Sequence, residues 1–180
     1  MFSNTFAKNI ASHLIELIAA DCERVEIVGS LRREKSSVND IDIIAIPRYQ
    51  IIKDDTLFGE PVRVNLLDRN LSARCLELYL NLELNGAKIK RFFREINGVK
   101  VPIDLYIATE ATWWTLLLLR TGSREHNIKL AMRAQGLHMH LKADGSGLLS
   151  PGGSLLPVSR EEDIFKHLQM PFKKPEERDC

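Results

Sequence analysis

Hydrophobic residues recur at helical spacing near the start of the chain and alternate with polar residues afterwards. The spacing over residues 5–20 predicts an amphipathic helix. Three β-type runs follow, RVEIV (24–28), DIDIIAIP (40–47) and PVRVNLLD (61–68), and residues 71–84 return to helical spacing. The runs AKIKRFFREI (87–96) and VPIDLYIA (101–108) flank Asn97-Gly98, a pair of turn residues that predicts a β-hairpin.

The pattern changes after residue 108. Residues 109–122 and 123–136 read as consecutive helices, with Thr109 and Ser123 as expected N-caps. A short β segment (137–142), a loop rich in Gly and Ser, and a short helix (159–170) complete this half. We therefore expect an α+β protein, with a mixed α/β half over residues 1–108 and a helix-led half over residues 109–180.

Composition excludes several classes of protein. With 44% hydrophobic and 27% charged residues, the chain is typical of a globular protein and unlike a disordered one. The apolar run at 112–119 is too short to span a bilayer, and three widely spaced cysteines favour reduced thiols over a disulfide framework. We expect a soluble intracellular protein without a membrane partner. Its net charge of +1 means that any attraction to phosphate comes from local clusters.

Three aspartates interrupt apolar β runs. Asp40 and Asp42 are two residues apart, so on a strand they project from the same face, where their charges repel unless a cation lies between them. A lone D-x-D is usually a solvated strand face, but Asp104 repeats the theme in a strand that can lie in the same sheet. Carboxylate oxygens are ligands for Mg²⁺, so the three together predict a two-metal site for phosphoryl transfer.

The turn before these aspartates has residues that suit an anion. A Gly29-Ser30 turn entering a short helix can direct backbone N–H groups and a hydroxyl at phosphate. Arg32 and Arg33 follow, and guanidinium groups match phosphate oxygens. Each arginine alone is also compatible with an exposed charged loop, so the joint spacing of Gly-Ser, D-x-D and the later Asp104 carries the prediction.

Four segments together resemble the family X DNA polymerases, the group that includes polymerase beta. GSLRRE…NDIDII resembles their nucleotidyltransferase signature, and VPIDLYIA is similar to their third catalytic strand. LLLLRTGSREHNIKLAMRAQGL resembles their T-G-S helix pair, and LPVSREEDIFKHLQMPFKKPEER their C-terminal end. The first element also occurs across the wider nucleotidyltransferase superfamily, whereas the T-G-S and C-terminal elements are more specific. The match runs from about residue 22 to the end.

The resemblance implies a palm, with a mixed β-sheet and helices on one side, followed by a small helical C-terminal thumb. It implies that Asp40 and Asp42 ligate two Mg²⁺ ions, for which Mn²⁺ can substitute, and that Asp104 ligates the catalytic ion. Further residues would bind the incoming nucleotide: Gly29, Ser30 and Arg33 at the triphosphate, Thr121, Gly122 and Ser123 under the sugar, and Arg124 and Asn127 at the base.

The chain departs from the family in three places. Leu119 and Arg120 replace the aromatic pair that crowds the sugar 2′ position, which puts deoxy over ribo selection in doubt. A template-contacting arginine aligns with Ala131, with Arg133 nearby as a possible DNA contact in its place. Only a short helix precedes the palm, as in the short viral members of the family, so we expect no lyase activity.

A basic stretch beside the third aspartate is the expected DNA contact. Lys88, Lys90, Arg94 and Lys100 lie there with Phe92 and Phe93 between them, although a solvated hairpin is the competing interpretation. If the stretch binds DNA, affinity should fall steeply with salt.

Three functions remain open from the sequence. The first is a minimal, monomeric DNA polymerase that fills short gaps, using primer–template or gapped DNA and nucleoside triphosphates. The second is a template-independent or ribonucleotide-tolerant transferase, and the third is an inactive nucleic-acid-binding module. Primer extension on templated and single-stranded substrates, with dNTPs and with NTPs, separates the first two.

Overall fold

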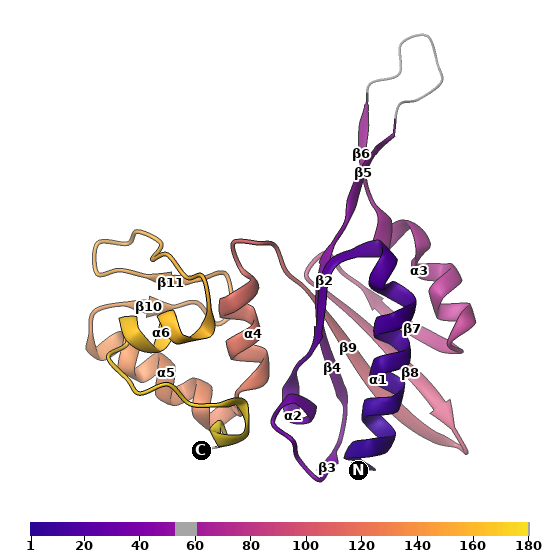
Figure 1. The fold of residues 1–180 in the computed structure, drawn as a ribbon, viewed down its shortest axis with the longest axis horizontal. Coiled ribbons are helices and arrows are strands. Elements are labelled where there is room, and N and C mark those ends of the chain that lie inside the picture. The colour runs from indigo at the N-terminus through magenta and orange to yellow at the C-terminus, as the bar shows by residue number, and fades with distance from the viewer. Residues whose placement is uncertain (53–60, 180) are drawn as a thin grey trace.

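The computed structural model describes residues 1–52 and 61–179, which form two lobes joined through helix α4 (Figure 1). The N-terminal lobe contains β1 (Phe2–Ser3), α1 (Asn4–Ile18), η1 (Ala19–Asp21), β2 (Cys22–Ile27), α2 (Gly29–Arg32), β3 (Ser37–Val38), β4 (Ile41–Pro47), β5 (Tyr49–Ile52), β6 (Val62–Asn65), α3 (Leu66–Glu77), β7 (Leu80–Asn85), β8 (Ile89–Ile96) and β9 (Val99–Ile107). The C-terminal lobe contains α4 (Trp113–Thr121), α5 (Arg124–Gly136), β10 (His140–Leu141), β11 (Leu148–Leu149), α6 (Glu161–His167) and η2 (Pro175–Glu177).

A five-stranded mixed sheet organises the N-terminal lobe. Its strand order is β2-β4-β9-β8-β7, and β4 and β9 are parallel while the other neighbours are antiparallel. Helices α1 and α3 cover one face of this sheet (Figure 1), where Ile43, Ile103 and Leu105 pack with Leu14 and Leu71 in one buried core. The expected α+β class, with a mixed sheet and helices on one side, is confirmed.

The predicted hairpin is present as β8 and β9. Its turn residues Asn97 and Gly98 have φ of 51° and 74°, a left-handed pair that a two-residue hairpin turn requires. The turn pairs Ile96 with Val99 and thereby sets the register of the whole hairpin, in which Arg91 lies directly opposite Asp104.

The helix expected over residues 71–84 is wrong in its second half. Helix α3 begins earlier, at Leu66, and ends at Glu77, and Leu80–Asn85 forms the edge strand β7 instead. Leucine alternates with other residues from Leu76 to Leu84, which is the period of a strand, so the error lay in reading a period of two as helical.

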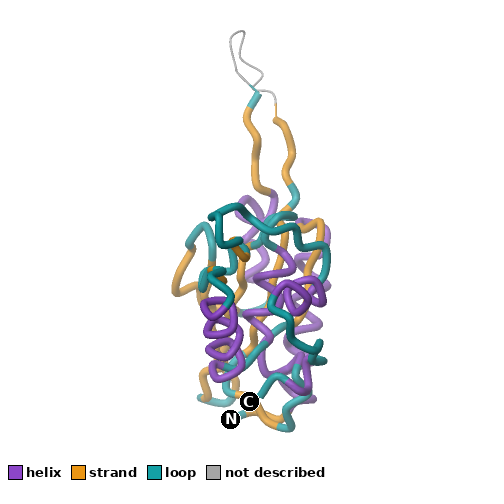
Figure 2. Tube along the Cα trace, turned by 90° about the vertical axis from the view of Figure 1, so that its left-hand side faces the viewer, coloured by secondary structure: helices purple, strands orange, loops and turns teal. Residues whose placement is uncertain are grey.

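A two-stranded hairpin, β5 and β6, projects away from the rest of the lobe (Figure 2). A single strand was predicted here, over residues 61–68, whereas the structure has strand β6 up to Asn65 and helix α3 from Leu66. Asn65 marks the change because its side chain caps the helix by accepting a hydrogen bond from the Asp68 amide.

The C-terminal lobe has its own core, built from Leu118, Leu130, Leu148 and Phe165 among others. Helix α4 also faces the sheet, because Trp113, Leu116 and Leu117 pack on Val28, Ile44 and Ile46 in a separate buried cluster. Its apolar residues therefore serve both lobes, which explains the nearly continuous apolar run in the sequence.

Two expectations about helix caps have different outcomes. Ser123 caps α5 by accepting a hydrogen bond from the His126 amide at 3.1 Å, as predicted. Thr109 is not the cap of α4, which begins at Trp113 after Thr112. Within the described part of the chain, every helix is too short or too polar to cross a bilayer. Cys22 and Cys75 are free and buried, and Cys180 lies outside the described residues.

Candidate active site

Two of the three aspartates lie directly opposite each other. Asp42 on β4 is the register partner of Asp104 on β9, and Asp40 lies one residue before β4 begins. Because Ile41, Ile43 and Ile103 point into the core under α1, alternation sends Asp42 and Asp104 to the opposite face of the sheet. The structure thus brings Asp42 and Asp104 to one sheet face, with Asp40 just before the strand.

The aspartates are close enough to influence one another's ionisation. Burial, followed by repulsion from Asp40 and Asp104, raises the pKa of Asp42 to about 7. Burial and the charge of Asp104 raise the pKa of Asp40 as well. This is the electrostatic environment that a divalent cation relieves, because a cation stabilises the charged form of every carboxylate that it touches.

The turn at Gly29 touches this group of carboxylates. Gly29 has φ of +65°, and a Cβ built there would lie 2.1 Å from Oδ2 of Asp42, so only glycine fits the position. The Val28 amide donates to the Asp42 carbonyl at 2.9 Å and holds the turn against β4. Among the described residues, the hydroxyl of Ser30 is buried without a hydrogen-bond partner, which leaves a donor for an incoming anion.

Asp104 is held by two neighbours that the sequence analysis did not single out. Nε of Arg91 on β8 donates to both Asp104 oxygens, at 3.1 and 3.4 Å, and the Tyr106 hydroxyl donates to Oδ2 at 3.3 Å. A signal for Arg91 was present in the sequence. If Asn97-Gly98 is a two-residue turn, counting outward from it places residue 91 opposite residue 104.

A preformed metal cluster is absent from residues 1–52 and 61–179, where no three His, Cys, Asp and Glu side chains are placed to hold one ion. Asp104 is turned toward Arg91 and Tyr106 in this arrangement. The donor set still fits Mg²⁺ or Mn²⁺, since it offers hard carboxylate oxygens whose mutual repulsion a cation would remove. The metal-ligand role of the three aspartates therefore stays a proposal.

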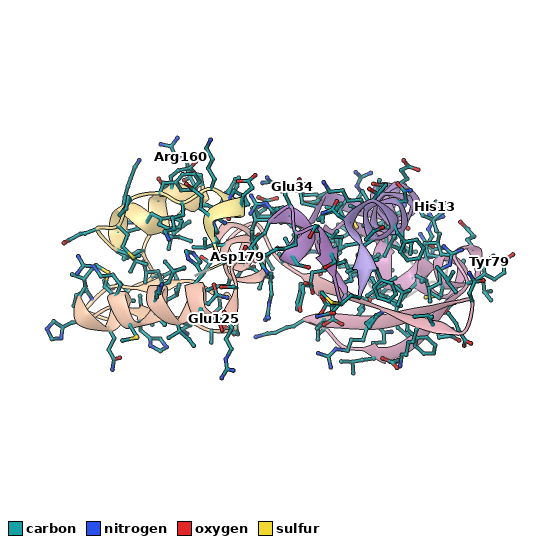
Figure 3. The ribbon with its side chains drawn as sticks, turned by 90° about the horizontal axis from the view of Figure 1, so that it is seen from below. His13, Glu34, Tyr79, Glu125, Arg160 and Asp179 are labelled. Carbon is teal, nitrogen blue, oxygen red and sulfur yellow. The ribbon has the colours of Figure 1, made fainter. Side chains whose placement is uncertain are left out.

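The two arginines after the Gly-Ser turn bind the C-terminal lobe. Arg33 donates through Nη1 to the Thr121 carbonyl at 2.6 Å and through Nε to Asp179 at 2.8 Å. Arg32 donates to the Thr121 hydroxyl at 2.8 Å and to both oxygens of Glu161 at 2.9 and 2.8 Å. Figure 3 shows Asp179 at the boundary of the two lobes, on the side of Glu34. The predicted phosphate arginine, Arg33, thus lies beside the predicted sugar turn.

The predicted nucleotide-binding turn is compact. Thr121 is fully buried, Ser123 caps α5, and a Cβ on Gly122 would lie 2.6 Å from Asn127 Oδ1. Asn127 donates to the Leu119 carbonyl at 2.7 Å, while its own side-chain oxygen is buried without a partner among the described residues. Arg124 is exposed beside this turn.

The expected DNA-binding residues divide between two faces of the sheet. Lys90 is 2% exposed and binds Asn85 and Asp68 inside the lobe, and Arg94 lines a pocket with His13 and Ile10 of α1. Both were wrongly assigned to a DNA-facing surface, because alternate residues of β8 point toward the helices.

The remaining basic residues differ in their partners. Lys100 lies over the Phe93 ring at 4.1 Å and pairs with Glu83, and exposed Lys88 pairs with Asp144 of the C-terminal lobe at 3.1 Å. Arg133 donates to the Leu168 carbonyl at 2.8 Å within its own lobe. Lys88 and Lys100 are therefore the two residues of the predicted set that remain on an exposed surface beside β9.

A cleft of about 410 Å³ opens between the lobes next to Asp104. Its lining includes Arg91 and Tyr106 from the sheet and Arg120 from α4. The Arg120 guanidinium stacks on the Tyr106 ring at 4.3 Å, so the residue at the expected sugar gate contacts the residue that binds Asp104. The cleft is therefore bordered by cations on both lobes.

Comparison with known proteins agrees with this architecture. Residues 116–179 match the family model described as DNA polymerase beta thumb. A crystal structure of Leishmania infantum polymerase beta, described as a ternary P/T complex, is similar with a TM-score of 0.73 and 20% sequence identity, over 99% of this chain and 77% of that chain. The expected polymerase beta-like fold is confirmed, and the thumb match lies within the C-terminal lobe, so the two lobes are called palm and thumb below.

Proposed function

We propose that this palm-plus-thumb chain is a DNA polymerase of family X, which adds a dNTP to a primer 3′-hydroxyl and releases pyrophosphate. The observation that carries the proposal is the juxtaposition of Asp42 and Asp104 on adjacent parallel strands, with Gly29 in contact with Asp42. Carboxylates gathered beside a phosphate-binding turn are the arrangement that nucleotidyl transfer needs.

Each residue of the site has a proposed task. Two Mg²⁺ ions, or Mn²⁺ in their place, held by Asp40, Asp42 and Asp104 would make the primer hydroxyl a better nucleophile and neutralise the triphosphate. The unpartnered Ser30 hydroxyl would donate to a phosphate oxygen, and the absence of a side chain at Gly29 leaves room for Asp42. Asp104, which lies across from Asp42, would face the primer end.

Arg33 would connect nucleotide binding to the thumb. Its guanidinium already contacts the Thr121 carbonyl and Asp179. We propose that a triphosphate at Ser30 competes with Asp179 for Arg33, while Thr121, Gly122 and Ser123 form the floor under the sugar. Arg124 and Asn127 would then lie at the base.

The substrate assignment follows the fold. The similar polymerase beta was solved as a ternary P/T complex. We propose that this chain acts on primer–template or gapped DNA, and that it does so as a monomer inside the cell. The palm would comprise residues 1–108 and the thumb residues 109–180. Lys88 and Lys100 would contact the DNA backbone beside β9, and Arg133 the template side of the thumb.

A single assay tests the polymerase proposal. Purified protein is incubated with gapped, templated or single-stranded DNA, with Mg²⁺ or Mn²⁺, and with each dNTP or NTP. We expect extension of the gapped and templated primers and loss of at least about 10³-fold in rate for Asp104→Asn, because this variant removes a carboxylate charge with little change in shape. Asp163→Asn, on α6 of the thumb, where the carboxylate pairs with Arg160 and Lys166, is the matched control and should extend normally. Equal extension by wild type and Asp104→Asn would contradict the proposal.

A ribonucleotide-tolerant or template-independent transferase is the second candidate. The observation in its favour is at the sugar gate, where Leu119 is buried in the thumb core and Arg120 is stacked on Tyr106. Neither residue offers an aromatic ring to the sugar. In the same assay, this candidate predicts comparable use of NTPs and dNTPs or extension of the single-stranded primer.

A further inference from the structure

Arg91 donates hydrogen bonds to both oxygens of Asp104, a proposed metal ligand. It faces Asp104 across the β8–β9 pair, and its Nε lies 3.1 Å from one carboxylate oxygen and 3.4 Å from the other. The Tyr106 hydroxyl, two residues along β9, donates to the second oxygen at 3.3 Å. Both oxygens of Asp104 are thus engaged by protein groups.

Much of the Arg91 side chain is exposed to solvent. Its side chain is 54% exposed, and it lines the palm–thumb cleft together with Lys88 and Arg120. An exposed guanidinium with neighbouring cations is well suited to a phosphate, because its planar donors match phosphate oxygens. Among the described residues, Asp144 is the one carboxylate that lines this cleft, and it pairs with Lys88.

We propose that Arg91 is a positioning residue. It holds Asp104 until nucleic acid binds, and its side chain then turns so that the guanidinium binds a backbone phosphate of the bound strand. This inference rests on the proposed function, because it assigns Asp104 to a divalent cation. Release of Asp104 would allow its oxygens to turn toward the cation that Asp40 and Asp42 share with it.

The consequence is a coupling between strand binding and cation binding. Arg91 and a divalent cation compete for the same two oxygens of Asp104, so the cation binds more weakly while Arg91 remains there. A phosphate that attracts Arg91 removes this competition. Because coupling is reciprocal, the cation should strengthen strand binding by the same factor.

The β8 strand offers a matched pair of variants. Arg91→Gln removes the guanidinium on the catalytic face, and Arg94→Gln removes one from the same strand on the α1 face. Arg91→Lys keeps the charge but loses the planar donors. Arg91 is exposed and Arg94 is half-buried, and circular dichroism with thermal unfolding checks that all three variants fold.

Two measurements test the inference without any turnover. Free Mn²⁺ is quantified by electron paramagnetic resonance, with and without a primer–template that ends in a dideoxynucleotide. Binding of the same DNA is followed by fluorescence anisotropy as a function of salt. We expect Arg91→Gln to bind Mn²⁺ about three-fold or more tightly than wild type without DNA, and to gain nothing further on adding DNA. Its salt slope for DNA should fall by about one.

Two further variants serve as controls for Arg91→Gln. Arg94→Gln should match wild type in both measurements, and Arg91→Lys should retain the salt slope while binding Mn²⁺ more tightly than wild type. If Arg91→Gln and Arg94→Gln behave alike in both measurements, the inference is overturned. Neither measurement needs nucleotide incorporation. An inactive wild-type protein in the extension assay would therefore count against the proposed function, while the Mn²⁺ and DNA binding measurements would still test the role of Arg91.

Discussion

Arg33 of the palm donates a hydrogen bond to the backbone carbonyl of Thr121 in the thumb, at 2.6 Å. The two residues are 88 positions apart, and the sequence assigned them to different parts of a nucleotide, the triphosphate and the sugar. This contact, together with the Arg33–Asp179 and Arg32 pairs, holds the two halves of the proposed nucleotide site against each other. A change in the palm–thumb angle would therefore change the site.

Gly29→Ala should disrupt both stability and the carboxylate site. The new Cβ would lie 2.1 Å from Asp42 Oδ2, and φ of +65° is unfavourable for alanine. We expect a loss of about 3 kcal/mol in the free energy of unfolding, together with weaker Mn²⁺ binding. Gly98→Ala is the matched control, because it has a similar φ of +74° but nothing within 4 Å, and should cost about 1 kcal/mol and leave Mn²⁺ binding intact. Urea unfolding and Mn²⁺ titration give the comparison; equal costs would contradict the steric account.

Glu161→Ala should destabilise the palm–thumb junction. Glu161 is 6% exposed and pairs with Arg32 and with fully buried Arg178. Burial alone would raise the pKa of Glu161, but hydrogen bonds from the two arginines lower it, so the carboxylate is charged and compensates both cations. Its removal leaves them without this partner and should cost about 3 kcal/mol. Asp163→Ala on the same helix loses only exposed partners and should cost less than about 1 kcal/mol, as measured by thermal unfolding.

Asp42→Asn should stabilise the protein at pH 8 while abolishing activity. The pKa of Asp42 is about 7 in the folded state against 3.8 as its ordinary value, so the folded protein binds more protons between these pH values. Stability contributed by the protonated group is therefore lost as pH rises from about 4 to 7. The variant lacks this loss and should be more stable than wild type by about 2 kcal/mol at pH 8.

Divalent cations give this prediction its control. Mg²⁺ should raise the unfolding temperature of wild type at pH 8 by neutralising the carboxylates, and should raise that of Asp42→Asn much less. Thermal unfolding at pH 5 and pH 8, with Mg²⁺ or with EDTA, measures both effects. If the variant is less stable than wild type at pH 8 with EDTA, ionisation of Asp42 does not destabilise the folded state and the prediction is wrong.

Substitution of Lys90 should affect stability, whereas substitution of Lys88 should affect DNA binding. Lys90→Ala removes a buried ammonium that binds Asn85 and Asp68, so it should lower the free energy of unfolding by about 2 kcal/mol with no change in the salt dependence of DNA binding. Lys88→Ala, which alters an exposed side chain, should be neutral for stability and reduce the salt slope by about one. Anisotropy titrations at several salt concentrations measure the slope; an unchanged slope for Lys88→Ala would remove it from the DNA interface.

The sequence determined the parts of this protein that depend on near neighbours in the chain. Alternation along a strand is local, so it placed Asp42 and Asp104 each within an apolar run, on the opposite side of its own strand from the core residues. Asn97-Gly98 and Ser123 were likewise correctly predicted as turn and cap, because the conformations they favour depend on only a few adjacent residues. The missed strand β7 was also locally encoded, in the alternating leucines that end at Leu84.

Which charged residues reach the site depends on contacts between distant parts of the chain. The hairpin register sets Arg91 opposite Asp104, but the side of the sheet that α1 covers decides that this face stays open while Lys90 and Arg94 face the helices. Arg33 contacts Thr121 because the thumb packs against the palm through α4. These outcomes come from strand pairing and from the packing of surfaces that are distant in the sequence. There the burial of apolar area outweighs local preference, so composition and spacing along the chain do not predict them.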